Sequence, residues 1–247
     1  MKLSRQTIDI LHWCSTIQKD LVIQPGNRVR TISISKSTLL EATVAETFPS
    51  TCALHSISRM LDYINDATDI SFSNPTYLEL RNGRTLTRVP KVSERLVIGP
   101  PAKGINIQNF EESFFLHSDD AYELRCLSGK DTVVEVYASK QGDNIRIDHF
   151  EKSLDKTCPV EPLIHTMELV KPQRSNQQFR CRFKLPDLNL WQGSYQVDIS
   201  SAGVGKFSWL NSDVVVYIAL QAQHSSFTAK AVSAETTKTV AAKGTAE

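Results

Sequence analysis

The chain has 247 residues, of which 40 % are hydrophobic and 22 % charged, as is common in globular proteins. This length allows one large or two small domains with a sizeable core, so we expect no dependence on disulfides or a metal ion. No apolar run approaches the ~18 residues of a membrane span, and the first residues lack the pattern of a signal peptide. We therefore expect a cytoplasmic protein with no membrane partner.

The net charge of +1 is unevenly distributed. Residues 1–109 contain 13 Lys and Arg against 9 Asp and Glu, whereas residues 110–222 contain 12 against 16. Tight binding to nucleic acid normally needs a more basic chain. The imbalance is small enough to arise by chance, but it would also allow one half of one copy to meet the other half of another.

The first half is predicted to begin with a helix from residue 4 to about residue 19. Ser4 is a suitable N-cap, and Leu3 and Ile8 have the spacing of a hydrophobic staple. Two alternating segments follow around Lys36, which predicts a β-hairpin. A second helix is predicted over residues 53–64, where apolar side chains recur three and four residues apart.

Short strands and then an irregular segment complete the first half. Strands are predicted at residues 69–73, 77–82 and 84–90. Residues 89–109 have little regular pattern, and Gly99, Pro100 and Pro101 disfavour a helix or a central strand there. We interpret 89–109 as an extended connector and 1–109, including it, as an N-terminal domain.

The second half repeats this order of elements and is predicted to form a C-terminal domain over residues 110–222. A strand at 110–116 is followed by a helix that Ser118 would cap, with acidic residues in its first turn and a stop at Gly129. Six strands and a short helix at 186–191 are predicted after it, and the last of these strands is at 213–220. Residues 223–247 are small, polar and without a core face, so we predict a disordered tail.

The sequence offers no convincing catalytic or metal-binding set. Asp119 and Asp120 suit a helix N-terminus better than an acid–base pair, and the five scattered cysteines lack the spacing of a zinc site. Asp148, His149 and Glu151 resemble a small metal cluster but also fit the end of a strand. The alternating segment "FRCRFK" (179–184) fits either a nucleic-acid platform or a half-buried strand, and the second is commoner. We expect no enzyme, no metal and no cofactor.

The order and spacing of several segments resemble the DNA polymerase sliding clamp, or processivity factor, of T-even-type bacteriophages. These segments are "GNRVRTISISKSTLLEATVAE", "LHSISRMLDYINDATDISFS", "LHSDDAYELRCLS" and "LPDLNLWQGSYQVDISSAGVGKF", and the resemblance covers about residues 1–222. It implies an α+β DNA-clamp fold, in which two similar domains each pack two helices on antiparallel sheet. It supplies no role for the tail.

The resemblance also implies what such a protein would bind. Three identical subunits would form a ring whose twelve helices, four from each subunit, surround duplex DNA without reading its sequence. A clamp loader driven by ATP would place the ring on DNA, and the replicative polymerase would bind it through a C-terminal peptide. A contact with the late-transcription machinery and a location in the cytoplasm of the infected bacterial host are implied as well.

Candidate site residues follow from this resemblance and from the polar helix faces. A ring that slides needs weak phosphate contacts, so its inner face should carry few basic groups. The candidates for this face are Arg5, His12, Lys19, His55, Arg59, Lys130 and Lys184. The candidates for a partner-peptide pocket near the connector are Val97, Ile98, Pro100 and Tyr217. A single-strand-binding or recombination accessory protein and a virion structural protein remain as alternatives.

Overall fold

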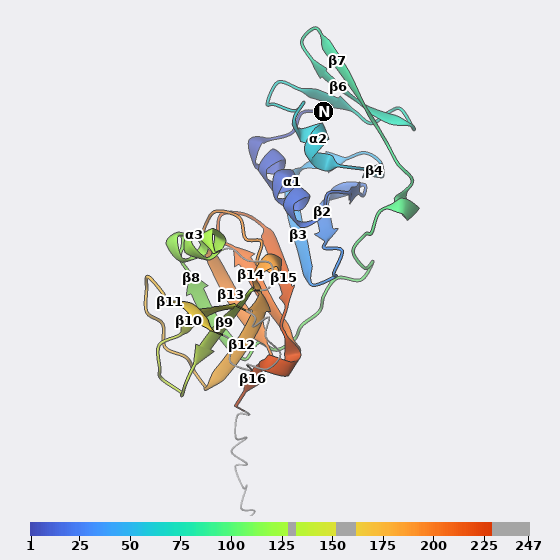
Figure 1. Ribbon diagram of the computed structural model, residues 1–247. Coiled ribbons are helices and arrows are strands. Elements are labelled where there is room, and N and C mark those ends of the chain that lie inside the picture. Colours follow the sequence, from blue (N-terminus) through green and yellow to red (C-terminus); the bar gives the residue numbers. More distant parts are fainter. Residues whose placement is uncertain (128–131, 152–161, 229–247) are drawn as a thin grey trace, which may run out of the picture.

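The computed structural model describes residues 1–127, 132–151 and 162–228 of the chain. Figure 1 shows two halves, one above the other, joined by a long connector along one side. The upper half contains α1, α2 and strands β1–β7, and the lower half contains α3 and strands β8–β16, with β2 and β3 extending toward the boundary. The part of the predicted tail (223–247) from residue 229 onward and the predicted helix stop at Gly129 lie outside the described residues.

The elements of the first half follow the predicted order. They are α1 (Arg5–Ile17), β1 (Leu21–Ile23), β2 (Gly26–Ile32), β3 (Thr38–Phe48), β4 (Cys52–Leu54), α2 (Ile57–Leu61), β5 (Asp69–Ser71), β6 (Tyr77–Asn82) and β7 (Thr85–Pro90). The predicted first helix is confirmed, with Ser4 as its N-cap accepting a hydrogen bond from the Thr7 backbone. The hairpin is confirmed as β2 and β3, and Lys36 in its turn has a φ of 59°.

The predicted helix at 53–64 is wrong in its first turn. Residues 52–54 form strand β4, which pairs antiparallel with β1 so that Leu54 lies opposite Leu21. The helix α2 contains only Ile57–Leu61, after Ser56 turns the chain with a φ of 56°. A short apolar run does not distinguish a helix from a fully buried strand, and pairing with β1 decided the outcome here.

The connector has one 3₁₀ turn, η1 (Glu94–Leu96), and no long strand or helix. Val97 is buried, whereas Leu96 is 75 % exposed and Ile98 is 43 % exposed. The Arg30 guanidinium donates to the Pro101 carbonyl at 3.0 Å, and the same side chain pairs with Glu41 at 2.6 Å. These bonds hold the middle of the connector against β2 and β3.

The second half contains fewer helical residues than predicted. Its elements are β8 (Glu112–Leu116), α3 (Ser118–Cys126), β9 (Thr132–Ala138), β10 (Arg146–Glu151), β11 (Leu163–Glu168), β12 (Phe179–Lys184), η2 (Leu185–Asp187), β13 (Tyr195–Ser200), β14 (Val204–Trp209), β15 (Val214–Ala219), η3 (Ala222–His224) and β16 (Ser226–Phe227). The N-cap of α3 is His117, one residue before the predicted Ser118, and Asp120 completes the capping box.

The helix predicted at 186–191 is replaced by the single 3₁₀ turn η2. Pro186 lies in the first turn of η2, and the chain then buries Leu188 and Leu190 without continuing as a helix. The described residues therefore contain three α-helices, whereas the resemblance implied four for each subunit. The predicted domain end at residue 222 also falls short, because β16 pairs with β12 through Phe227 and Ser226.

One sheet contains strands from both halves. Its order is β2-β3-β15-β14-β13-β8, so β15 near the end of the chain pairs with β3 near its beginning. A five-stranded sheet, β11-β10-β9-β12-β16, faces it across the core of the second half, where the Phe183 and Phe207 rings lie 5.8 Å apart. The remaining sheets are β5-β6-β7 and β1-β4.

Trp13 of α1 binds the first half to the second. Its side chain is fully buried and donates a hydrogen bond to the Asn189 carbonyl at 2.7 Å. Its ring lies 6.3 Å from that of Trp191 and 6.1 Å from that of Trp209. Such aromatic pairs stabilise beyond the area that they bury, so α1 is fixed to the β13–β14 region rather than to its own half alone.

Candidate nucleic-acid interface and partner hollow

The solvent-facing side of α1 carries few charges. Arg5 is exposed and His12 is half-buried on the side away from the buried Ile10, Leu11 and Cys14, and Lys19 is exposed just after the end of the helix. Arg5 forms an ion pair with Asp9 one turn later, at 3.3 Å. The structure thus brings Arg5 and His12 onto one helix surface, whereas Lys19 lies beyond the C-cap of α1.

The two predicted residues near α2 lie in different local environments. Arg59 is exposed on α2, in the helix turn that buries Ile57 and Leu61 beneath it. His55 lies in the turn before α2, because the helix begins later than predicted, and its Nδ1 is 2.8 Å from the Asp20 carboxylate. His55 is thus engaged with an acidic neighbour, whereas Arg59 has no ion pair among the described residues.

Sequence reasoning missed Arg125, which is exposed on α3. Arg125 lies one turn after the buried Ala121 and directly after the buried Leu124, so it is at the flank of the buried face, whereas the exposed Asp119 and Tyr122 are on the opposite side of α3. The spacing of the buried residues therefore did not identify it. The exposed parts of the three helices carry both acidic and basic groups.

The last two predicted DNA-facing residues, Lys130 and Lys184, are not on the helix surfaces described above. Lys130 lies outside the described residues. Lys184 ends β12, where Phe179, Cys181 and Phe183 are buried in the core and the alternate residues face away from it. Lys184 is therefore on the outer face of a sheet and not among the helices. The same burial supports the half-buried strand as the interpretation of "FRCRFK".

A hollow of about 560 Å³ lies between the connector and the β1–β2 region. Two of the four residues proposed for a partner pocket, Val97 and Pro100, line it, together with Gly99 and Ala102 of the connector. Glu94 of the connector also lines it, and its other wall is formed by Val22, Gln24, Pro25, Arg28 and Arg30. The hollow combines apolar side chains with a few charged groups, which is typical of sites that accept a ligand or a peptide side chain.

Two of the predicted pocket residues are not part of this lining. The side chain of Ile98 is 43 % exposed, whereas its neighbour Val97 is buried in the wall. Tyr217 is on β15, opposite Leu39 of β3. The residues that sequence reasoning missed, above all Arg28 and Arg30, belong to a strand far from the connector in sequence, so local pattern could not connect them.

The acidic and histidine residues considered for chemistry have structural surroundings. Asp120 accepts hydrogen bonds from the His117 and Val170 backbones, both at 2.9 Å. Asp148 and His149 are successive residues of β10 and so point to opposite faces of the sheet. Within the described parts of the chain, no three His, Cys, Asp or Glu side chains converge on a point that could hold a metal ion.

No helix in the described residues is long and apolar enough to cross a membrane.

Comparison with known proteins gives matches in sequence and in structure. The sliding clamp of Vibrio phage KVP40 is 23 % identical over 222 residues, covering 87 % of this chain and 98 % of that protein. No protein-family model matches the chain. The PCNA of Entamoeba histolytica has a TM-score of 0.58 at 10 % identity, with 87 % of this chain and 94 % of that one covered.

Two further solved structures share the fold. A PCNA2–PCNA3 complex from Sulfolobus tokodaii has a TM-score of 0.60 at 11 % identity, with 87 % of this chain and 96 % of that one covered. The PCNA of A. fulgidus, solved with the C-terminal region of FEN-1, has a TM-score of 0.58 at 10 % identity, with 89 % and 96 % covered. The predicted α+β DNA-clamp fold is thereby confirmed. The phage match along nearly the whole chain, taken with this fold, supports a sliding clamp of the phage type, a class of non-enzymatic processivity factors.

Proposed function

We propose that the chain forms a homotrimeric ring that encircles duplex DNA and tethers the replicative DNA polymerase of a bacteriophage. The observation that carries this proposal is the match to a phage sliding clamp over nearly the full length of both chains, combined with the shared clamp fold. Two solved relatives are complexes, one between two PCNA chains and one with a FEN-1 segment. The ring would act in the cytoplasm of the infected bacterial host.

Two unpaired sheet edges support the proposed ring. Among the described residues, β7 ends the three-stranded sheet of the first half and β11 ends the five-stranded sheet of the second. Exposed strand edges offer backbone groups for pairing with another chain. β7 carries Arg88 and the partly exposed Leu86, whereas β11 carries Glu168 and the exposed Leu163. Antiparallel or parallel pairing of β7 with β11 of a neighbour would join groups of opposite charge.

The three helix faces are the proposed DNA-facing surface. Arg5, Arg59 and Arg125 are exposed on these helices and Lys19 just after α1, with Asp9 and Asp119 close enough in sequence to offset some of this charge. Each phosphate contact adds salt-dependent affinity, so a balanced face would hold DNA loosely and permit sliding. His12 and His55 would add only weak contacts. Lys130 remains a candidate outside the described residues.

The hollow under the connector is the proposed site for the C-terminal peptide of the polymerase. Val97 and Pro100 would contact an apolar side chain, and the exposed Arg28 would pair with a carboxylate of the peptide. A clamp loader driven by ATP would open the ring, and the same hollow would serve late-transcription partners. The fold of the connector, held by Arg30, would keep this hollow formed before the peptide binds.

The mass in solution is the first test of the proposed function. Light scattering after size-exclusion chromatography should give a species near three times 27.7 kDa. Primer extension with the cognate polymerase and loader should then be processive on circular templates and decline on linear ones, because a ring slides off open ends. A strict monomer at micromolar concentration would contradict the ring and favour a single-strand-binding or virion protein.

Point variants test the two surfaces separately. Arg59→Glu should reduce processivity without dissociating the trimer, whereas Lys140→Glu, the same change on an exposed hairpin far from the helices, should not. Val97→Ala should weaken binding of a polymerase C-terminal peptide, with Ile98→Ala as a control of similar size outside the lining. Equal effects of the variant and its control would remove the proposed role of Arg59 or of the hollow.

A further inference from the structure

The outer sheet face is the side of the five-stranded sheet that is turned away from the core. Along β12 the buried Phe179, Cys181 and Phe183 point inward, so Arg180, Arg182 and Lys184 point outward. The hairpin strands β9 and β10 continue this face, because their register joins them to β12 residue by residue. The proposed ring assigns no role to this face.

Cross-strand register places the basic residues of this face in rows. Arg146 of β10 and Arg180 of β12 are both Cα partners of Tyr137 on the strand between them. Because neighbouring strands lie about 4.8 Å apart, the two arginines flank the tyrosine at a separation of roughly 10 Å between their backbones. Lys184 lies four residues after Arg180 on the same strand. The basic residues therefore extend across the strands from Arg146 to Arg180 and then along β12 from Arg180 to Lys184.

A buried carboxylate fixes the orientation of the arginines. Glu135 is 2 % exposed and lies under Arg180 and Arg182, whose Nε and Nη2 atoms approach its two oxygens at 3.1 and 3.0 Å. The Arg180 side chain is nevertheless 57 % exposed, and it uses only Nε for this contact. Its two terminal nitrogens are thus held at the surface, ready to donate to an anion.

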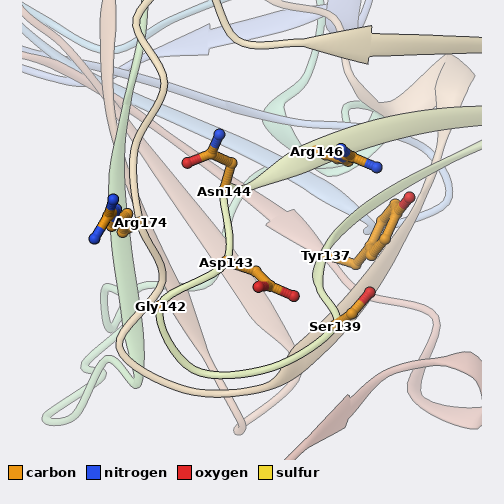
Figure 2. A pocket seen from close by; sticks show the side chains of 7 residues that line it. All are labelled: Tyr137, Ser139, Gly142, Asp143, Asn144, Arg146 and Arg174. Carbon is orange, nitrogen blue, oxygen red and sulfur yellow. The ribbon is translucent and has the colours of Figure 1, made fainter.

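The exposed charge on this face is mainly basic because its acids are buried or sit at the edge. Glu135 and Asp148 are both buried, and the exposed Glu168 on the edge strand β11 pairs with Arg146 at 3.3 Å. Beside the row lies a polar hollow of about 350 Å³ that includes Arg174. Figure 2 shows Arg146, Tyr137 and Ser139 on one side of the 142–144 loop and Arg174 on the other.

We propose that the outer sheet face binds the sugar–phosphate backbone of a nucleic-acid strand that does not pass through the ring. The ligand is anionic because Arg146, Arg180 and Lys184 are exposed on this face and Arg174 is exposed at the hollow beside it. A docked protein segment would need an apolar centre, whereas Phe150 on this face lies beneath the Arg182 guanidinium, 5.5 Å from its ring centroid. The basic side chains extend both across and along the strands, without an apolar groove, and this arrangement fits a phosphate backbone. It provides no group of side chains that would distinguish one base from another.

The test uses a covalently closed single-stranded DNA circle in low salt without a clamp loader, since such a circle cannot enter a closed ring. The wild-type chain should bind it, and Arg146→Gln combined with Lys184→Gln should lower the affinity at least fivefold. Loss of two phosphate contacts should also reduce the slope of log affinity against log salt by about 1.4. Lys2→Gln combined with Lys103→Gln makes the same change in net charge at two exposed positions elsewhere and should bind like the wild type.

Two further measurements keep the outcome unambiguous. Arg180→Gln should weaken binding as well, and circular dichroism would show whether the loss of a partner for Glu135 has unfolded the sheet. Wild-type affinity in the double variant, or an equal loss in the control pair, would overturn the proposal. Binding of a poly-glutamate peptide but not of the DNA circle would overturn it in favour of an acidic protein partner. Processive synthesis should survive in all of these variants, so failure of the ring and failure of the outer site give different results.

Discussion

Replacing Trp13 with alanine should cost more stability than any other single change in α1. The indole is fully buried and contacts three aromatic rings, those of Trp191, Tyr195 and Trp209. Its Nε1 atom donates a hydrogen bond to the Asn189 carbonyl at 2.7 Å. No other side chain of the helix combines this volume with contacts to the second half.

The expected loss follows from the size of the cavity and from the unpaired carbonyl. Large-to-small changes of a buried tryptophan typically cost about 3–5 kcal/mol. The lost hydrogen bond adds on the order of 1 kcal/mol. We therefore expect about 4–6 kcal/mol, which is comparable to the whole free energy of unfolding of many domains, about 5–15 kcal/mol. Trp13→Phe keeps a ring in the cluster and should recover roughly half of the loss.

Urea unfolding followed by circular dichroism measures this loss for Trp13→Ala and Trp13→Phe against the wild type. A decrease below about 1 kcal/mol for Trp13→Ala would refute the reasoning, since it would mean that the aromatic cluster does not fix α1 to the second half. Ser15→Ala, on the half-buried side of the same helix, is the control and should cost little.

The remaining predictions concern a glycine, the thiols and a histidine. Gly193→Ala should destabilise the protein far more than Gly142→Ala, although both glycines have positive φ. An added Cβ at 193 would lie 2.2 Å from the Trp209 Nε1 atom, whereas one at 142 would meet no atom within 4 Å. Equal unfolding midpoints of the two variants would contradict this. In a chain with Cys158→Ser, thiol labelling of the native protein at pH 8 should modify the exposed Cys126 and spare Cys14 and Cys52. Burial raises the pKa of Cys14 to about 12 and that of Cys52 to about 11, so neither thiol is ionised at this pH. Rapid labelling of either would show that its site opens. Burial, aided by nearby His165, lowers the pKa of His149 below its ordinary 6.5, so the unfolded chain binds this proton more readily and stability should decline as the pH falls through 6.5. His149→Gln should flatten that decline in unfolding midpoints measured at pH 7.5 and 5.5, and an unchanged slope would assign it to other groups.

The fold could be predicted from sequence where local signals agreed with tertiary packing. Ser4, the Leu3–Ile8 pair and the long apolar stripe defined α1, and the alternation around Lys36 defined the β2–β3 hairpin. The errors occurred in short apolar segments. Leu54 and Leu190 are buried without being helical, and apolar spacing in so short a segment does not distinguish a helix from an extended chain.

The candidate site was predictable only in part for a related physical reason. Val97 and Pro100 were identifiable because the connector is irregular and apolar there, whereas Arg28 and Arg30 reach the same hollow only after β2 pairs with β3. Lys184 was assigned to the DNA-facing surface from its charge, but strand alternation with Phe183 turns it outward. Sequence pattern gives the face of an element, and long-range pairing decides which faces meet.

The sheet shared by the two halves constrains how the chain can be made. Thr38 to Ala42 of β3 pair with Ile218 to Val214 of β15, so the first half cannot complete its sheet until nearly the whole chain has left the ribosome. Contacts between residues so distant in sequence form slowly because a long loop must close first. During synthesis the edge of β3 is open to other chains. A chain released early, before β15, would lack a partner for β3.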